Sequence, residues 1–313
     1  MKDILEILIP TYNRKQHIER TLKQLIAENS PVKDCQITVL DNASTDGSSE
    51  VIDRFASFHK NIKHIRHPKN IGGNANIARC YEMARTPYVW VVCDDDSFKW
   101  NSWSEIKNAL STNDYDLLLT RKRDLKGTSN IAKIFRQCTF VPAGIYKTSL
   151  ITNSVLMNMY NNIPFLFPHL SLVTEIFNRH GRIFIPQGEI MDMCSYDSEH
   201  SGDGSYTRGN NAYVPGYSRN MFWTVGVIVS TQMIENKKLR NYVLDHIGSR
   251  GFFGFIFAGF RPNYKIYRGS KFNEAVARNS LNFWHRIQFD LACLLLKIVF
   301  LFVPKKRKDK PNR

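Results

Sequence analysis

Several features that point to common protein classes are missing from this sequence of 313 residues. The six cysteines are scattered and never form a C-x-x-C pair, so neither a zinc site nor a disulfide framework is indicated, and a reduced, cytosolic setting is expected. The apolar run 4–9 is broken by Glu6 and followed by polar residues, so we expect no secretory signal. A G-x-G-x-x-G fingerprint is also missing, so a dinucleotide-binding oxidoreductase is only weakly supported.

Long hydrophobic runs are missing as well. The stretch 291–303 has 13 residues with Lys297 inside, whereas a membrane-spanning helix needs about 20 apolar residues. Asn282, Arg286, Asp290 and Lys297 follow one another at spacings of four, four and seven, which places them on one polar stripe of a helix. With the basic run 305–308, this pattern predicts a helix in the plane of a membrane surface. A helix packed on the rest of the chain or on a second copy is the alternative.

Acidic residues are under-represented: 43 Lys and Arg face 28 Asp and Glu, a formal charge of +15, which suggests a polyanionic partner. Residues 261–313 carry 13 basic and three acidic side chains, whereas residues 151–260 carry eight of each. Aromatic residues alternate with basic ones from residue 252 to residue 289, and this composition also occurs in proteins that bind single-stranded nucleic acid. Because the tail's aromatics accompany an apolar helix, an anionic membrane surface is the favoured partner of residues 261–313, and nucleic acid is the alternative.

The remaining composition, 43% hydrophobic, is enough for a packed core. The first 120 residues alternate short β-branched runs with helical patterns, which predicts an α/β fold with a mostly parallel, Rossmann-like sheet flanked by helices. We expect strands at 4–10, 36–41, 62–67, 88–93 and 116–120, and helices at 15–28, 48–58, 74–84 and 102–110. In such sheets ligands bind at the carboxyl ends of the strands.

After residue 120 the pattern is looser. We expect helices at 147–160 and 169–179, strands at 182–186 and 189–196, and helices at 217–235 and 238–260. The loop 197–216 is rich in Gly, Ser, Asp and Tyr and is interpreted as either an active-site lid or a linker.

Three consecutive carboxylates, Asp94-Asp95-Asp96, directly follow the apolar run 88–93. Adjacent carboxylates repel one another unless a cation or hydrogen-bond donors compensate them. Oxygen ligands of this kind suit Mg²⁺ or Mn²⁺, which can neutralise a diphosphate. A solvated acidic turn or a helix N-cap is the alternative, but the position after a buried strand favours the metal.

Two further polar segments follow the second and third expected strands. Asp41 opens the stretch D-N-A-S-T-D-G, where it is either a ligand-binding carboxylate or a turn-stabilising residue. Gly72 and Gly73 precede the helix 74–84, so the backbone there can approach a ligand closely and the helix N-terminus favours an anion.

These segments together resemble the N-terminal half of family 2 glycosyltransferases. The resemblance rests on residues 7–14 (I-L-I-P-T-Y-N-R), 40–48, 70–74 and 94–96, and covers roughly the first 120 residues. It implies a GT-A-type fold and transfer of a sugar from a nucleoside diphosphate sugar. It also implies that a Mn²⁺ or Mg²⁺ ion takes part.

The resemblance also implies residue roles. The base of the nucleotide would be held by Pro10, Thr11, Tyr12 and Asp41. The ribose and phosphates would lie by Gly72 and Gly73. Within the acidic triplet, Asp94 and Asp95 would bind the nucleotide sugar, and Asp94 and Asp96 the metal; the match does not settle the division of roles there.

A general base completes the expected site. Family members commonly carry a Glu-Asp pair at the start of a helix, and here the nearest candidate is Glu175, without a following Asp. An inverting transfer needs one carboxylate to accept the proton of the acceptor hydroxyl. Glu175 is therefore the candidate base, with an ordinary helix-surface residue as the alternative. His169 is interpreted as structural, and the further candidates are Asp192, Glu199, His200 and Asp203.

The sequence thus predicts a metal-dependent, inverting glycosyltransferase at the cytoplasmic face of the inner (plasma) membrane that uses a lipid-linked glycan acceptor. We expect a nucleotide-sugar-binding half (1–120), an acceptor and catalytic half with a lid (121–216) and a helical, membrane-associating extension (217–313). A nucleic-acid-binding protein and a metal-dependent nucleotidyltransferase are the alternatives. The second lacks its expected glycine-rich basic loop, because residues 11–14 read T-Y-N-R.

Overall fold

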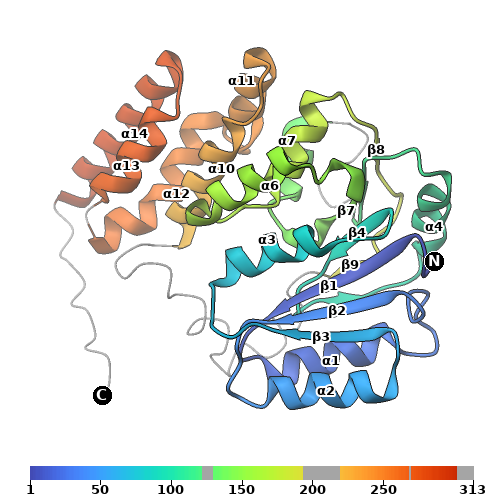
Figure 1. Cartoon of the computed structure of the whole chain (residues 1–313). Helices are drawn as coiled ribbons and strands as arrows, with labels where there is room; N and C mark the ends of the chain where they lie inside the picture. The colour runs from blue at the N-terminus through green and yellow to red at the C-terminus, as the bar shows by residue number, and fades with distance from the viewer. Residues whose placement is uncertain (122–129, 193–218, 268, 302–313) are drawn as a thin grey trace. The chain divides into compact units, whose positions relative to one another are not determined.

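The computed structural model describes residues 1–121, 130–192, 219–267 and 269–301 (Figure 1). The chain divides into two compact units, residues 1–210 and residues 211–313, which are described separately.

The first unit is built on a seven-stranded sheet with the order β3-β2-β1-β4-β7-β6-β8. Strands β1, β2, β3 and β4 run parallel to one another, β7 runs antiparallel to β4 and β6, and β8 is parallel to β6. A small second sheet pairs β5 with β9. The strands are β1 (Leu5–Thr11), β2 (Gln36–Asp41), β3 (Ile62–Arg66), β4 (Tyr88–Val91), β5 (Ser97–Phe98), β6 (Leu117–Leu119), β7 (Gly144–Lys147), β8 (Ile183–Phe184) and β9 (Met191–Asp192).

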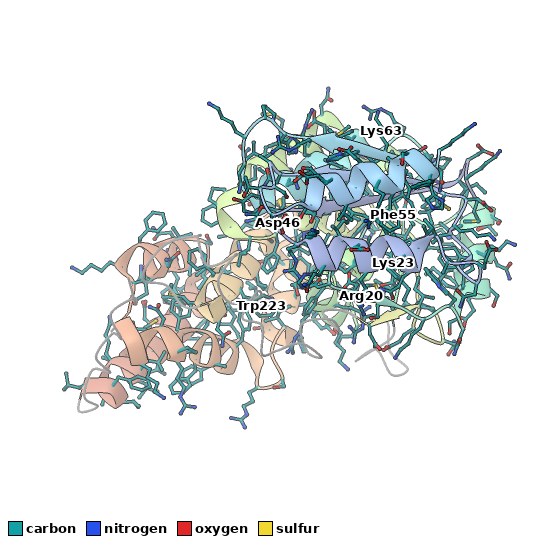
Figure 2. All side chains as sticks on the ribbon, turned by 90° about the horizontal axis from the view of Figure 1, so that it is seen from below. Arg20, Lys23, Asp46, Phe55, Lys63 and Trp223 are labelled. Atoms are coloured by element: carbon teal, nitrogen blue, oxygen red, sulfur yellow. The ribbon has the colours of Figure 1, made fainter. Side chains whose placement is uncertain are left out.

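Helices cover both faces of this sheet. Helices α1 and α2 lie side by side on one face, with Phe55 of α2 in the interior, and α3 lies on the other face (Figures 1 and 2). Alternate residues of β1, namely Leu5, Ile7 and Ile9, are fully buried in the core that α1, α2 and α4 complete. The helices are α1 (Lys15–Leu25), α2 (Ser48–Phe58), α3 (Gly73–Met83), α4 (Trp103–Thr112), α5 (Ile131–Gln137), α6 (Asn153–Asn161) and α7 (Leu170–Asn178).

The expected α/β class with a mostly parallel sheet is confirmed, and so is the order of its first four strands and three helices. From β1 the chain moves outward through β2 to β3 and then returns to the far side of β1 as β4. The carboxyl ends of β1 and β4 therefore form a topological switch point, where open α/β sheets bind ligands.

The helix expected at 147–160 is wrong in its first part. Residues 144–147 form strand β7, which lies between β4 and β6, and a 3₁₀ turn (Thr148–Leu150) precedes α6. Only Lys147 of the expected helix belongs to β7, where it pairs with Tyr88 of β4, while Ile145 before it lies opposite both Trp90 and Leu118. Pairing with two neighbouring strands thus extends the sheet to the start of the expected helix. In the expected strand 189–196 only Met191–Asp192 is extended; residues 189 and 190 are not part of a strand, and residues 193–196 lie outside the described residues.

The second unit is helical where it is described, as expected for the C-terminal extension. Its helices are α10 (Arg219–Thr231), α11 (Lys237–His246), α12 (Gly251–Tyr267), α13 (Lys271–Asn279) and α14 (Phe283–Leu301). The single helix expected at 238–260 is wrong: α11 ends before Gly248, and α12 begins at Gly251, whose positive φ of 66° breaks the helical path. None of the helices in the described ranges is long and apolar enough to cross a bilayer.

Candidate active site

The candidate site lies where β1, β2 and β4 end. Because these strands are parallel, the segments that follow them emerge at one edge of the sheet. The four sequence segments singled out above all lie at this edge, and side-chain hydrogen bonds connect them. The site is therefore assembled from parts that are far apart in the chain.

Asp94 joins the end of β1 to the segment after β4. The Thr11 hydroxyl donates a hydrogen bond to Asp94 Oδ2 at 2.7 Å, and Arg14 Nε lies 2.8 Å from Asp94 Oδ1. Arg14 also reaches Asp95, with 3.4 Å between Nη2 and Oδ2. Asp94 and Asp95 are buried, and Arg14 keeps only 12% of its side-chain surface exposed. A guanidinium thus compensates two adjacent carboxylates at the switch point.

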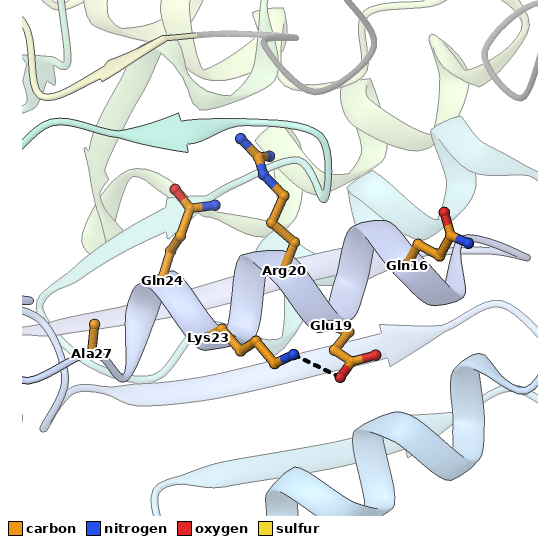
Figure 3. Close-up of a pocket in the computed structure, with 6 residues that line it drawn as sticks. All are labelled: Gln16, Glu19, Arg20, Lys23, Gln24 and Ala27. Carbon is orange, nitrogen blue, oxygen red and sulfur yellow. Dashed lines mark ion pairs between the residues drawn. The ribbon is translucent and has the colours of Figure 1, made fainter. Parts of the chain in front are cut away.

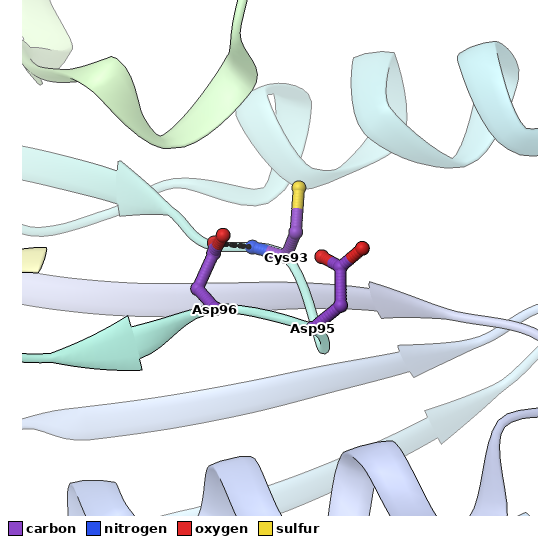
Figure 4. A group of neighbouring side chains, drawn as sticks. All are labelled: Cys93, Asp95 and Asp96. Carbon is purple, nitrogen blue, oxygen red and sulfur yellow. Dashed lines mark hydrogen bonds between the residues drawn. The ribbon is translucent and has the colours of Figure 1, made fainter. Parts of the chain in front are cut away.

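Asp96 holds the turn after β4 in place. Its side chain is fully buried, and its Oδ2 accepts a hydrogen bond from the Cys93 backbone N–H at 3.0 Å (Figure 4). Its carbonyl oxygen accepts from Arg20 Nη1 at 3.0 Å and from Gln24 Nε2 at 3.4 Å, both on α1. The Thr21 hydroxyl supports the same turn by donating to the Asp94 carbonyl at 2.9 Å.

The same turn offers a group of side chains that could hold a metal ion. Ligand atoms of Cys93, Asp95 and Asp96 lie within 4.8 Å of one another, and this is the one such group among the described residues (Figure 4). The two carboxylates suit Mg²⁺ or Mn²⁺, whereas the thiol of Cys93 suits softer metals. The residues present therefore fit a hard divalent cation through Asp95 and Asp96. Asp94, expected as a metal ligand, is occupied by Thr11 and Arg14, and the division of roles within the triplet stays a prediction.

Asp41 is fully buried and surrounded by donors. It accepts hydrogen bonds from the Ser44 backbone N–H at 2.9 Å and from the Ser49 hydroxyl, and His64 Nε2 lies 3.7 Å from its Oδ2. Burial alone would raise the pKa of Asp41, but the hydrogen bonds from His64, Ser44 and Ser49 outweigh it and hold the pKa well below its usual range. The carboxylate is thus ionised and shapes the loop after β2. Its expected contact with the base of the nucleotide stays a prediction.

Three asparagines connect the remaining segments. Asn42 Nδ2 donates to Asn70 Oδ1 at 2.8 Å, and Asn42 Oδ1 accepts from the Ile71 backbone N–H at 2.9 Å, which holds the segment before Gly72 against the loop after β2. Asn13 Oδ1 accepts from the Thr45 backbone N–H at 2.7 Å and so links that loop to β1.

Four expected nucleotide-contacting residues flank this network. Gly72 has φ of 89° and ψ of 151°, a backbone conformation that is essentially restricted to glycine, and Gly73 begins α3. Tyr12 follows β1 with 36% of its surface exposed, next to the partly buried Pro10. The structure brings these residues to the same edge as the acidic triplet.

The acceptor-side candidates are more dispersed. Glu175 lies in the second half of α7 and forms an ion pair with Arg179, one turn later. Asp192 pairs with Lys99, and Glu199, His200 and Asp203 lie outside the described residues. Glu175 stays a prediction as the base.

His169 is fully buried directly before α7. Its Nε2 lies 2.8 Å from the Cys138 carbonyl oxygen. Burial lowers the pKa of His169 to about 4, only partly offset by that hydrogen bond, so the ring is neutral near pH 7. This environment supports the structural interpretation of His169.

The sequence did not single out the α1 residues that hold the acidic turn. Arg20, Thr21 and Gln24 are contributed by a helix whose pattern shows only an amphipathic surface. Arg20 and Gln24 also line a surface depression along α1, where Lys23 Nζ lies 2.9 Å from Glu19 Oε1 (Figure 3). The position of Arg14 directly after the polar end of the first strand was the sequence signal that could have identified it as a site residue.

Comparison with known proteins identifies a family and a fold. A family model described as "Glycosyl transferase family 2" matches residues 6–173. The abequosyltransferase RfbV of Salmonella typhimurium is 30% identical over 120 residues, which cover 38% of this chain and 36% of RfbV. The chain thus spans only about a third of the length of the curated relatives that it matches first.

Two solved structures share the fold over nearly the whole chain. TarS 1–349 of S. aureus in complex with UDP-GlcNAc superposes with a TM-score of 0.53 and 13% identity, covering 95% of this chain and 91% of that one. The mannosyltransferase PcManGT from Pyrobaculum calidifontis, in complex with GDP-Man and Mn²⁺, gives a TM-score of 0.54 at 14% identity, covering 96% and 87%. The expected GT-A-type fold is confirmed.

Proposed function

Because the chain belongs to glycosyl transferase family 2, we propose that it transfers a sugar from a nucleoside diphosphate sugar to a lipid-linked glycan acceptor. One observation carries this proposal: Thr11 and Asp94 meet at 2.7 Å where β1 and β4 end, with Arg14 beside them. A carboxylate and a cation at the switch point of a parallel sheet are placed to contact the sugar and phosphate parts of one extended ligand.

The donor is a nucleotide sugar, and a divalent cation accompanies it. The solved neighbours that contain UDP-GlcNAc, and GDP-Man with Mn²⁺, support this choice. Asp95 and Asp96 would hold Mn²⁺ or Mg²⁺, which supplies positive charge to the diphosphate leaving group. Arg14 contributes a second positive charge from the chain itself.

The reaction is a displacement at the anomeric carbon with inversion. The acceptor hydroxyl oxygen forms the new glycosidic bond, the bond to the diphosphate oxygen breaks, and a carboxylate accepts the hydroxyl proton. Glu175 is the candidate for that carboxylate. Its side chain is paired with Arg179. Glu175→Gln removes the carboxylate that would accept the proton, so it is expected to reduce transfer while leaving nucleotide-sugar binding unchanged.

The acceptor is a lipid-linked glycan, and the reaction takes place at the cytoplasmic face of the plasma membrane. The apolar, basic composition of residues 261–313 supports this location. Another relative is a poly(ribitol-phosphate) beta-N-acetylglucosaminyltransferase of Staphylococcus aureus, 22% identical over 164 residues, and its name supports a polymeric acceptor.

The test is ligand-dependent thermal stabilisation with a panel of UDP-, GDP-, CDP- and dTDP-sugars, each with Mn²⁺, with Mg²⁺ and with a chelator. A ligand that binds only the folded state raises its stability by mass action. We expect at least one nucleotide sugar to raise the melting temperature in a cation-dependent way, and Asp96→Asn to abolish the shift.

Asp114→Asn is the matched control, because Asp114 precedes β6 at the opposite edge of the sheet and lies near Arg182. A panel in which no nucleotide sugar stabilises the protein contradicts the proposal. An Asp96→Asn variant that responds like the wild type contradicts the role of the acidic turn.

A further inference from the structure

Helix α14 is apolar on two opposite sides. One side packs inside the second unit, where α14 contacts α12 and α13, and its buried residues are His285, Phe289, Ala292, Cys293, Leu296 and Phe300. The other side is exposed and just as apolar. Its residues, each at least 37% exposed, form what we term the outer face: Phe283, Trp284, Ile287, Leu291, Leu294, Leu295, Ile298, Val299 and Leu301.

The angular distribution of these residues is unusual for a surface helix. At about 100° per residue, the outer face and the buried side are centred roughly opposite each other. Arg286, Asp290 and Lys297 fall between them within a stripe of about 40°. A surface helix of a water-soluble domain carries its polar residues on the side away from the core, whereas here that side is apolar except for the half-buried Gln288.

Two residues of the polar stripe form ion pairs with α13. Arg278 of α13 forms a two-pronged ion pair with Asp290, with Nε 2.8 Å from Oδ1 and Nη2 2.9 Å from Oδ2. Lys297 Nζ lies 3.8 Å from Glu274 Oε2, also on α13. These pairs fix the rotation of α14 against α13, so the outer face is held away from the core.

The sequence segment that contains α14 is strongly basic. Residues 261–313 carry 13 basic and three acidic side chains, and four consecutive basic residues, 305–308, follow α14 in the sequence. Exposed aromatic residues such as Phe283 and Trp284, at 67% and 71%, are typical of the boundary between water and lipid. Apolar insertion and attraction to anionic headgroups would therefore act together.

We infer that the outer face of α14 is a docking surface for an anionic lipid bilayer, with the helix in the plane of the membrane. A second copy of the chain is a poorer occupant, because pairing two such faces would bring together two segments of charge +10 each. The inference deepens the proposed function by naming the surface that would bring the site to a lipid-linked acceptor. Docking does not itself depend on the sugar chemistry.

The test is co-sedimentation of the full chain with vesicles of phosphatidylcholine alone and of phosphatidylcholine mixed with phosphatidylglycerol. We expect binding to the mixed vesicles that weakens as salt is raised, and weaker binding to phosphatidylcholine alone. The double substitution Leu291→Asn with Leu294→Asn removes two apolar side chains from the outer face and should reduce the partition coefficient at least about tenfold.

Phe58→Asn is the matched control, because Phe58 of α2 is 79% exposed and lies in the other unit. Insertion depth is read separately from quenching of tryptophan fluorescence by brominated lipids. We expect quenching in the wild type and its loss in Trp284→Phe. Circular dichroism of each variant checks that the helical content is retained.

Several results would overturn the inference: no binding to phosphatidylglycerol vesicles at low salt, binding unchanged by the double substitution, or a wild-type dimer that the same substitution converts to a monomer. Its failure is separable from failure of the proposed function, because nucleotide-sugar stabilisation is measured without vesicles. If the chain bound vesicles but no nucleotide sugar, the docking surface would be supported and the proposed sugar-transfer activity would be refuted.

Discussion

Arg14 contacts two of the three carboxylates of the acidic turn, since it reaches both Asp94 and Asp95. The three groups are largely buried, so their charges are poorly screened by solvent. Removing one partner of a buried ion pair leaves an uncompensated charge and is more costly than the pair is worth. A divalent cation bound at the same turn would supply part of the missing positive charge.

We therefore predict that Arg14→Ala lowers the free energy of unfolding by about 3 kcal/mol in a chelator and by clearly less with Mn²⁺. The measurement is urea unfolding under both conditions. Arg54→Ala is the matched control: Arg54 of α2 forms an exposed ion pair with Glu19, 3.0 Å between Nη2 and Oε1, so the loss of stability in this variant should not depend on the cation. An equal loss for Arg14→Ala with and without Mn²⁺ would contradict the electrostatic account.

His169 shows a second residue-scale effect, because its burial keeps the ring neutral. With a folded-state pKa of about 4 and an ordinary value near 6.5, the unfolded chain binds more protons between these pH values. The stability due to the neutral ring is present above pH 6.5 and is lost as the pH falls toward 4, by up to about 3 kcal/mol. His169→Gln should remove this part of the pH dependence of unfolding, whereas His59→Gln should retain it.

At the scale of elements, α10 and α12 pack tightly against each other at Gly259. A Cβ atom placed there would lie 1.9 Å from the Thr224 hydroxyl oxygen and 2.8 Å from Thr224 Cβ. Thr224 is buried, and its hydroxyl donates to the Asn220 carbonyl oxygen at 2.9 Å, so it cannot move aside freely. The absence of a side chain at Gly259 therefore sets the distance between the two helices.

Gly259→Ala should lower the free energy of unfolding by about 1–3 kcal/mol through overpacking, although alanine favours helix by about 1 kcal/mol. Ala258→Ser, on the exposed side of α12, should change it by less than about 0.5 kcal/mol. Thermal or urea unfolding followed by circular dichroism makes the comparison. A Gly259→Ala variant as stable as the wild type would show that α10 and α12 can separate at no cost.

Across the whole molecule, the distribution of charge is more informative than its sum. Residues 1–150 carry 22 basic and 17 acidic side chains, whereas residues 261–313 carry 13 and three. The acidic turn is compensated locally by Arg14, and the basic excess is carried by a separate part of the sequence, residues 261–313. The described aromatic side chains at this end belong to packed helices or to the outer face.

We accordingly predict that the chain prefers anionic vesicles to single-stranded oligonucleotides when the two compete at the same salt concentration. Binding to a bilayer combines insertion of apolar side chains with electrostatic attraction, whereas binding to an oligonucleotide depends mainly on electrostatic attraction and base stacking. Fluorescence anisotropy of a labelled oligonucleotide, titrated with phosphatidylglycerol vesicles, measures the preference. An oligonucleotide that is not displaced would favour the nucleic-acid interpretation.

The sequence alone determined the order of strands and helices in the first 120 residues and the four segments that meet at the sheet edge. Those signals are local: periodicity, turn residues and carboxylates directly after an apolar run. Only the tertiary structure decided which side chains meet, because Thr11 and Asp94 are 83 positions apart and Ile145 becomes a strand residue through its neighbours in the sheet. The second side of α14 was likewise decided by packing, since α12 and α13 cover one apolar side and leave the other exposed.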